Sequence, residues 1–253
     1  MRHKLTTELR YPGLWRGCVG AWNPGLGPSG LTLRDWSRFG RHATLTNMDV
    51  ASDWVTSGGR YALDFDGSND YVAVPSSAIM TYPATVCFWV LSKSFVAFQG
   101  LFNTTAGTSG FSALMGVTGR PYCYCNGTLL QPTPYTLVLN QWYHLAYTLA
   151  AGDRRIFVDG KLYGSDAGTV PASSSAVEAI GAYVGLFYTN GQIDDVFVHN
   201  RVLSSQEISL LASRRGIAYE LAPRRRSSVA VAAGGFNAAW IPRRSLVIGG
   251  GTN

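Results

Sequence analysis

The stretch YALDFDGSNDYVAV, residues 61–74, decides the fold class. Apolar and polar residues alternate on both sides of Asp66-Gly67, a dipeptide that is typical of a turn. Pro75 then ends the second run, because proline cannot donate a hydrogen bond within a sheet. The stretch therefore predicts two β-strands joined by a turn.

The same signals recur along the chain. Residues 85–91, TVCFWVL, are rich in β-branched and aromatic residues and predict a buried central strand. Asn126-Gly127 and Asp159-Gly160 each stand between strand-like runs, which is the strongest short hairpin signal. Strands that follow one another at roughly 8–12 residues indicate a sandwich or a barrel. We expect an all-β fold, a two-sheet antiparallel jelly-roll sandwich.

The division of the chain into segments is predicted from where the strand pattern begins and ends. Residues 1–20 lack periodicity and are expected to form an arm, and residues 21–213 the sandwich. One short helix is expected near the end of the sandwich, where Ser204 and Glu207 have the spacing of a capping box. Residues 214–253 are expected to form an extended Arg-rich tail for docking or oligomerisation.

Charge separates the sandwich from the tail. Residues 1–213 hold 14 Lys or Arg and 14 Asp or Glu, whereas residues 214–253 hold seven Arg and one Glu, so the whole net charge of +6 lies in the tail. Clustered Arg could bind nucleic acid or remain solvated, but no interleaved aromatic platform accompanies them beyond Phe236 and Trp240. The alternation of Arg groups with apolar runs favours docking on other proteins. The expected docking residues are Arg214, Arg215, Arg224, Arg225, Arg226, Phe236, Trp240, Arg243 and Arg244.

Several classes of protein are disfavoured. The first 15 residues lack the apolar core of a signal peptide, and no apolar window is long enough to span a membrane. The cysteines do not have the spacing of a zinc site, so we expect free thiols, with a single Cys18–Cys87 bridge left open. Glycoside hydrolysis needs paired carboxylates, and the four Glu residues form no cluster. We expect no enzymatic activity.

Six pieces occur in one order over residues 21–213: AWNP (21–24), LRDWSRFGRHATL (33–45), ALDFDGSNDYV (62–72), QWYHLA (141–146), FVDG (157–160) and GQIDDVFVHNRVLS (191–204). In this order they resemble the LamG-like branch of the concanavalin A-like lectin/glucanase superfamily. The resemblance implies the jelly-roll sandwich, with Trp22, Trp89 and Trp142 at core positions. Fold alone does not fix a function.

The resemblance also implies a candidate calcium site, since many LamG-like domains carry Ca²⁺ at one rim. Asp35, Asp194 and Asp195 match the positions that would supply carboxylate ligands. Arg38 and Arg41 stand where the family often has small or amide residues, and their charge opposes a cation. The alternative is that Asp35 caps its own loop by accepting backbone N–H groups.

Residues 43–49, 212–220 and 246–251 are similar in sequence to LamG-like proteins of tailed phages and prophages. This similarity implies a virion-associated structural protein, made in the bacterial host cytoplasm, that serves as a capsid decoration or fibre-head module. Its tail would bind other virion proteins, and a homo-oligomer such as a trimer would suit virion symmetry. The alternative is a carbohydrate-binding adhesin that recognises a host surface glycan. Candidate aromatic platforms for a sugar are Tyr122, Tyr124, Tyr183, Phe187 and Tyr188.

Overall fold

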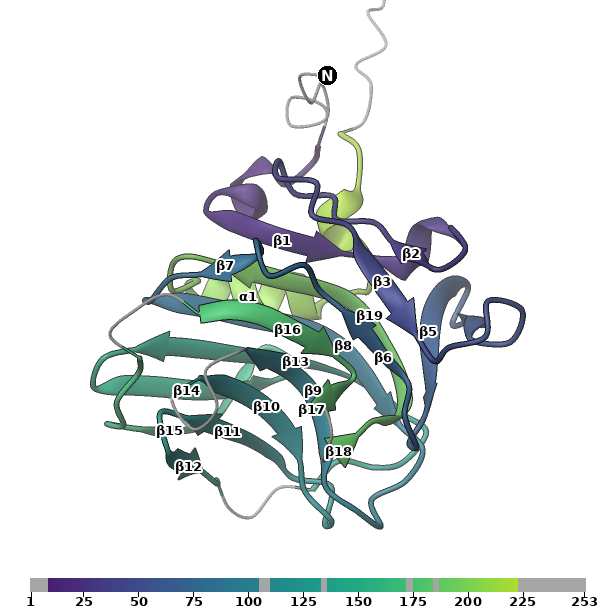
Figure 1. Cartoon of the computed structure of the whole chain (residues 1–253). Coiled ribbons are helices and arrows are strands. Elements are labelled where there is room, and N and C mark those ends of the chain that lie inside the picture. Colours follow the sequence, from purple (N-terminus) through teal and green to yellow (C-terminus); the bar gives the residue numbers. More distant parts are fainter. Residues whose placement is uncertain (1–8, 105–109, 133–135, 172–174, 184–186, 223–253) are drawn as a thin grey trace, which may run out of the picture. The chain divides into compact units, whose positions relative to one another are not determined.

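The computed structural model describes residues 9–104, 110–132, 136–171, 175–183 and 187–222. These residues form two large sheets that pack face to face, and every strand pair in the sheets is antiparallel (Figure 1). The predicted all-β sandwich is therefore confirmed. Both predicted hairpins are also present, with Asn126-Gly127 joining β11 to β12 and Asp159-Gly160 joining β14 to β15.

The first sheet has eight strands. Strand β19 has β5 and β1 on the same edge: β5 pairs with residues 190–193 and β1 pairs with residues 196–199. In order, the strands are β15 (Lys161–Asp166), β14 (Asp153–Val158), β13 (Trp142–Ala150), β8 (Ala84–Ser92), β19 (Asn190–His199), β5 (Arg60–Asp66) and β4 (Trp54–Ser57), with β1 at Cys18–Trp22.

The second sheet has nine strands. Its order is β12 (Thr128–Leu130), β11 (Pro121–Cys125), β10 (Phe111–Met115), β9 (Gln99–Thr104), β16 (Ser175–Ile180), β6 (Tyr71–Ala73), β3 (Ala43–Thr46) and β2 (Thr32–Leu33), with β7 (Ile79–Met80) also paired to β16. A separate pair joins β17 (Ala182–Tyr183) to β18 (Phe187–Tyr188). The helices are α1 (Ser205–Ala212) and the short 3₁₀ turns η2 (Pro12–Trp15), η3 (Pro24–Leu26) and η5 (Ile217–Tyr219).

The main core lies between the two sheets. Alternate residues of each strand point inward, so Val86, Phe88 and Val90 of β8 are all buried in it. Phe88 stacks on Tyr147 of β13, with ring centroids 6.0 Å apart. Burying a side chain of this size contributes roughly 1.5–3 kcal/mol, so the alternation that predicts the strands also supplies the stability.

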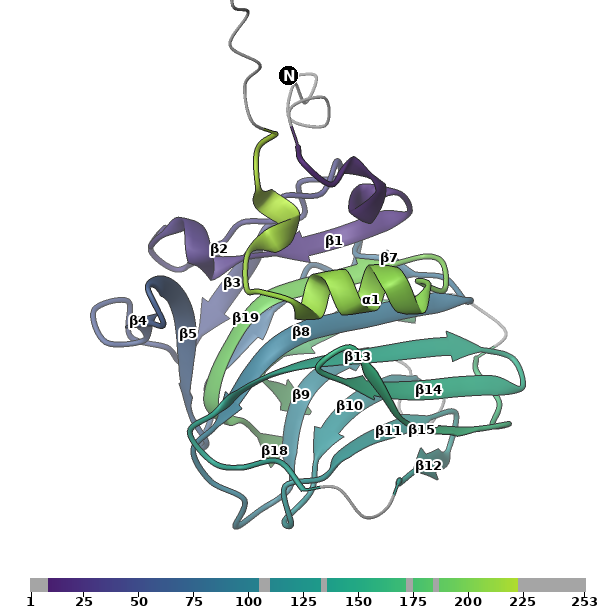
Figure 2. The same cartoon turned by 180° about the vertical axis from the view of Figure 1, so that it is seen from behind.

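A second cluster covers the outer face of the eight-stranded sheet. Figure 2 shows α1 lying on this face, where Ile208 and Leu211 pack with Cys87, Phe197 and other residues of the sheet. The predicted capping box is confirmed: the Ser204 side chain accepts from the backbone of Glu207, and the Glu207 carboxylate accepts from the backbone of Ser204. The eight-stranded sheet is thus covered on both faces.

All four cysteines are free and buried. Cys18 lies on β1 and Cys87 on β8, and both strands pair with β19, which separates them. Two strand spacings amount to about 9–10 Å, whereas the Cα atoms of a disulfide lie within about 7 Å. The Cys18–Cys87 bridge that the sequence left open is therefore incompatible with this sheet. Burial also raises the pKa of both thiols.

The boundaries of the compact unit differ from the expected ones. It runs to Ala222 rather than to residue 213, because Ile217 and Ala218 of η5 are buried in the second cluster. At the other end, Leu14 of the expected arm packs in the same cluster, and Leu9 forms a bridge with Leu221. The docking candidates Arg224, Arg225, Arg226, Phe236, Trp240, Arg243 and Arg244 lie outside the described residues. Among the described residues, no helix has the length and apolarity needed to cross a membrane.

Arg154 of β14 connects the two sheets at the edge of the sandwich. Its side chain is 1% exposed, and it forms a paired contact with Asp166 of β15. The same guanidinium donates to the carbonyl of Cys125 (3.1 Å) and to the hydroxyl of Thr128 (2.8 Å) in the other sheet. A methionine, which is shorter and has no N–H group in its side chain, would leave these acceptors without a donor.

Arg154→Met is expected to lower the free energy of unfolding by about 2–4 kcal/mol, because it breaks a buried ion pair and leaves its partners unpaired. Denaturation in urea, followed by tryptophan fluorescence, measures this change. The control is Arg155→Met, since Arg155 is exposed and its one ion pair within the described ranges is with Asp153, and we expect a loss below about 1 kcal/mol there. Equal losses in the two variants would contradict the role of Arg154 as an inter-sheet connection.

Candidate functional site

Strand β19 changes its partner in its middle. Residues 190–193 pair with β5, and residues 196–199 pair with β1. Asp194 and Asp195 occupy the gap between the two pairings, and the ladder with β8 is irregular at the same place. Two adjacent acidic residues are therefore buried at the junction of three strands.

The backbone turns both carboxylates to one side. In a regular strand, neighbouring side chains point to opposite faces. Asp195 instead has a φ of 49°, in the left-handed region, and it forms a bulge. Both side chains consequently reach Arg60, the first residue of β5.

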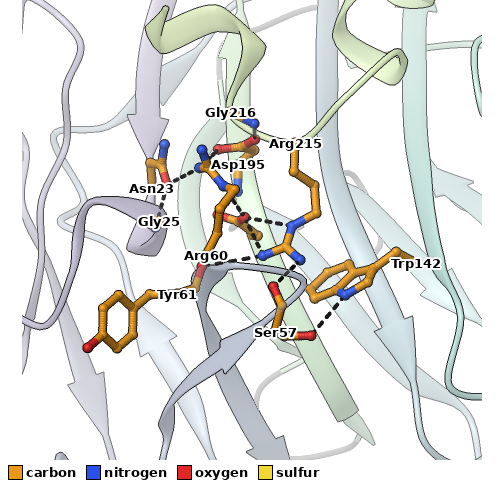
Figure 3. Close-up of polar contacts among 10 residues, drawn as sticks. Asn23, Gly25, Ser57, Arg60, Tyr61, Trp142, Asp195, Arg215 and Gly216 are labelled. Carbon is orange, nitrogen blue, oxygen red and sulfur yellow. Dashed lines mark hydrogen bonds and ion pairs between the residues drawn. The ribbon is translucent and has the colours of Figure 1, made fainter.

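Two arginines neutralise the two aspartates, and we call Arg60, Asp194, Asp195 and Arg215 the Arg–Asp cluster (Figure 3). Arg60 lies 3.2 Å from Asp195 and 3.5 Å from Asp194, and Arg215 lies 2.9 Å from Asp194. The two Asp side chains are 0% and 6% exposed. Buried charges of this kind persist only when they are paired and hydrogen-bonded.

Arg215 joins the segment after α1 to the sandwich. Its guanidinium donates to the carbonyls of Ser57 (2.8 Å) and Tyr61 (3.4 Å). It also lies over the ring of Trp142, 3.9 Å from the centroid, and the Trp142 indole N–H donates to the hydroxyl of Ser57 (Figure 3). The sequence predicts that Arg215 docks on a partner. Its position differs from that expectation, because its side chain is 8% exposed and is used within the chain. Arg214, the neighbouring candidate, is exposed and pairs with Glu220.

Two glycines make room for the Arg60 guanidinium. A Cβ atom at Gly25 would stand 2.1 Å from its Nη2 atom, and one at Gly216 would stand 1.6 Å from its Nη1 atom. Gly216 also has a φ of 78°, a conformation that favours glycine, and its N–H donates to Asp195. Asn23 accepts a further hydrogen bond from Arg60 at 3.3 Å. The beginnings of η3, β5 and η5 therefore meet at one guanidinium.

The cluster alters the acidity of Asp195. Burial, and after it the charge of Asp194, raises the pKa of Asp195 to about 7, while the charge of Arg60 opposes this rise. The folded state therefore binds a proton at Asp195 more tightly than the unfolded chain does. This contribution to stability is complete below the ordinary pKa and is lost as the pH rises through about 7.

The calcium candidates do not come together as a metal site. Asp35 accepts hydrogen bonds at 2.8–2.9 Å from the backbone of Ala21, Ser37 and Arg41 and from the Ser37 hydroxyl. Asp35 thus caps its own loop, as in the alternative to calcium binding that the sequence suggested. Asp194 and Asp195 are already neutralised by Arg60 and Arg215. These residues do not fit a calcium ion, and no group of three or more His, Cys, Asp or Glu within the described ranges is arranged to hold a metal.

A polar row crosses the outer face of the nine-stranded sheet. Asn103 of β9 lies opposite Ser112 of β10, which lies opposite Tyr124 of β11. The Ser112 hydroxyl donates to the Asn103 side chain at 2.5 Å, and the Asn103 amide donates to Glu178 of β16 at 2.5 Å. Their neighbours in sequence, such as Phe102 and Phe111, face the core. We call Asn103, Ser112, Glu178 and Tyr124 the polar row.

The predicted aromatic positions are distributed between core and surface. Trp22 is fully buried, as expected, whereas Trp89 and Trp142 are only half-buried. Of the candidate platform residues, Tyr122 is buried, and Tyr124, Tyr183, Phe187 and Tyr188 are half-buried. Phe98, which the sequence did not single out, contacts Tyr122 and Phe187 at 6.0 and 5.7 Å between centroids. Arg60 was not among the predicted site residues. The signal that could have indicated it is the pair of acidic residues between the apolar Ile193 and Val196, because buried carboxylates need cationic partners.

Asp195→Asn is expected to remove a pH dependence of stability. The measured quantity is the free energy of unfolding of the unaltered chain minus that of the variant. This difference should decrease as the pH rises from about 4 to 7, by up to about 1.4 kcal/mol per pH unit. Urea denaturation at several pH values measures this difference. Asp153→Asn is the control, since Asp153 is exposed. A difference that stays constant with pH would contradict the raised pKa of Asp195.

Comparison with known proteins agrees with this architecture. Domain 4 of a GH43 extracellular arabinanase from Geobacillus stearothermophilus, solved in complex with arabinotriose, matches 77% of this chain and 98% of its own, with a TM-score of 0.62 and 16% identity. Trypanosoma rangeli sialidase matches 78% of this chain but 33% of its own, with a TM-score of 0.59 and 16% identity. These identities show a shared fold alone. No curated protein matches the sequence. Residues 66–209, more than half of the chain, match the family model, so the chain belongs to the concanavalin A-like lectin/glucanases superfamily.

Proposed function

We propose that this chain is a non-enzymatic structural protein of a tailed-phage virion. The sandwich would project as a capsid decoration or fibre-head module, and the Arg-rich tail would anchor it to other virion proteins. The observation that carries the proposal is the Arg–Asp cluster, which fixes the segment before the tail to the body of the sandwich.

A tail can hold the sandwich in a defined position only if the segment that joins them is fixed to the sandwich. Arg215 joins the residues after α1 to β4, β5, β13 and β19, and η5 is buried behind it. Residues 223–253 then carry five Arg and no acidic residue. A fixed base followed by a cationic segment suits attachment to an acidic protein surface, where guanidinium groups pair with carboxylates.

The chemistry of the sheets supports a non-enzymatic role. Glycosidases of the common type place two carboxylates across the scissile bond. Glu178 is the only Asp or Glu in the described strands of the nine-stranded sheet, whose outer face carries the polar row. A single carboxylate beside an amide and a hydroxyl can hold a ligand but cannot supply both acid and base.

The anchoring role predicts the effect of neutralising the tail. Replacing Arg224, Arg225 and Arg226 by Ser is expected to lower the number of copies per particle by about tenfold or more, because three charged contacts are lost. Quantitative mass spectrometry of purified particles measures the copies relative to the major capsid protein. Arg155→Ser, on the sandwich surface, should leave the number unchanged. Absence of the unaltered chain from the particles would refute the virion role.

A second candidate function, carbohydrate binding by an adhesin, is favoured by the polar row. Amide, carboxylate and hydroxyl groups beside a half-buried tyrosine are the groups that hold a sugar, which has polar edges and an apolar face. The arabinanase domain of the same fold was solved with arabinotriose. The two roles are compatible, because the polar row and the Arg–Asp cluster belong to different sheets.

Glycan binding predicts a loss at the polar row. On a glycan array, any ligand of the unaltered chain should bind at least about tenfold less to Asn103→Ala, because hydrogen bonds to the ligand are removed. Glu178→Gln should show an intermediate loss, since it keeps the shape but not the charge. Thr44→Ala, on the exposed part of the same sheet, is the control. Binding that survives in Asn103→Ala would place a sugar site elsewhere.

A further inference from the structure

A groove of about 710 Å³ lies between the first described residues, β1 and η5. Trp15, Trp36 and Tyr219 contribute half-buried aromatic rings to its walls. Leu26 and Leu221 line it as well, and they are 54% and 58% exposed. Neither proposed function uses this groove, and its size and apolar lining are those of a ligand site.

Its walls are held in place from several directions. The Trp15 indole N–H donates to the carbonyl of Ala218 (2.9 Å), and its ring packs edge-on against Tyr219 and Phe197. Leu9 bridges to Leu221 beside the groove. The apolar surface is therefore kept open by packing on the sandwich rather than by a chance side-chain position.

Two cationic side chains stand at the groove. Arg16 and Arg38 both line it, both are exposed, and neither forms an ion pair with another described residue. The buried indole N–H of Trp36 makes no hydrogen bond within the described part of the chain. An occupant with an anionic group would pair with both arginines, since a charged acceptor strengthens each contact.

Charge decides between the candidate occupants. Residues 223–253 contain five Arg and no acid, so their charge has the same sign as Arg16 and Arg38 and does not supply the anion. A neutral sugar needs more polar partners than this apolar lining offers. We propose that the groove binds an amphiphile with an apolar body and a carboxylate headgroup, the body lying between Trp15 and Trp36 and the carboxylate near Arg16 and Arg38.

The test uses the full chain and nuclear magnetic resonance of its tryptophan side chains. The indole N–H signal of Trp36 is assigned as the one that is lost in Trp36→Phe. Dodecanoate should shift this signal, whereas the signal of Trp142, which donates to Ser57, should stay in place. Dodecanol and dodecyltrimethylammonium share the chain but carry a neutral and a cationic headgroup. Both should bind at least about tenfold more weakly than dodecanoate.

Variants separate headgroup recognition from general adsorption. Replacing Arg16 and Arg38 together by Gln should bring the affinity for dodecanoate to within about threefold of that for dodecanol, because only the apolar contacts remain. Lys161→Gln removes one exposed positive charge on β15 and should change neither affinity. The outcomes that overturn the proposal are no shift of the Trp36 signal with dodecanoate, equal affinity for the three headgroups, or an equal loss in Lys161→Gln.

Discussion

The structure depends on the neutralisation of Asp194 and Asp195 in the middle of β19. This strand pairs with three others in the eight-stranded sheet: β8 lies along one of its edges, and β5 and β1 share the other edge. Two uncompensated carboxylates at the point of sharing would cost several kcal/mol each. Arg60 supplies a cation from β5, and Arg215 supplies one from beyond α1, so residues distant in sequence must be in place together. The bulge, the glycines at 25 and 216 and the path of the C-terminal segment all follow from this requirement.

The two sheets consequently have different roles. The eight-stranded sheet has its inner face in the main core and its outer face under α1, η2 and η5, and it serves as the frame. The nine-stranded sheet shares the core but carries amide, hydroxyl and carboxylate groups on its outer face. The Arg–Asp cluster and the polar row therefore belong to different sheets.

The fold could be predicted from the sequence because its signals are local. Strand alternation in residues 61–74, the Asn126-Gly127 and Asp159-Gly160 turns and the Ser204–Glu207 capping box each depend on a few neighbouring residues, and all were found. The candidate site depends on contacts over long separations, such as Arg60 with Asp195, which no periodicity reveals. The calcium candidates show the same limit: Asp194 and Asp195 can be identified in the sequence, whereas their pairing with Arg60 and Arg215 cannot. The alternation of Arg groups with apolar runs places Arg215 among the docking candidates, whereas its side chain contacts β4, β5, β13 and β19.

The two ends of the described unit lie side by side, as the Leu9–Leu221 bridge and the 2.7 Å hydrogen bond from the Arg10 N–H to the Glu220 carbonyl show (Figures 1 and 2). A domain with neighbouring ends can be inserted into a loop of another protein without disturbing its host. The same arrangement governs mechanical resistance. A force that separates the two flanking segments acts first on this small bridge and on the Arg10–Glu220 ion pair, and the sheets bear load only after these contacts have opened.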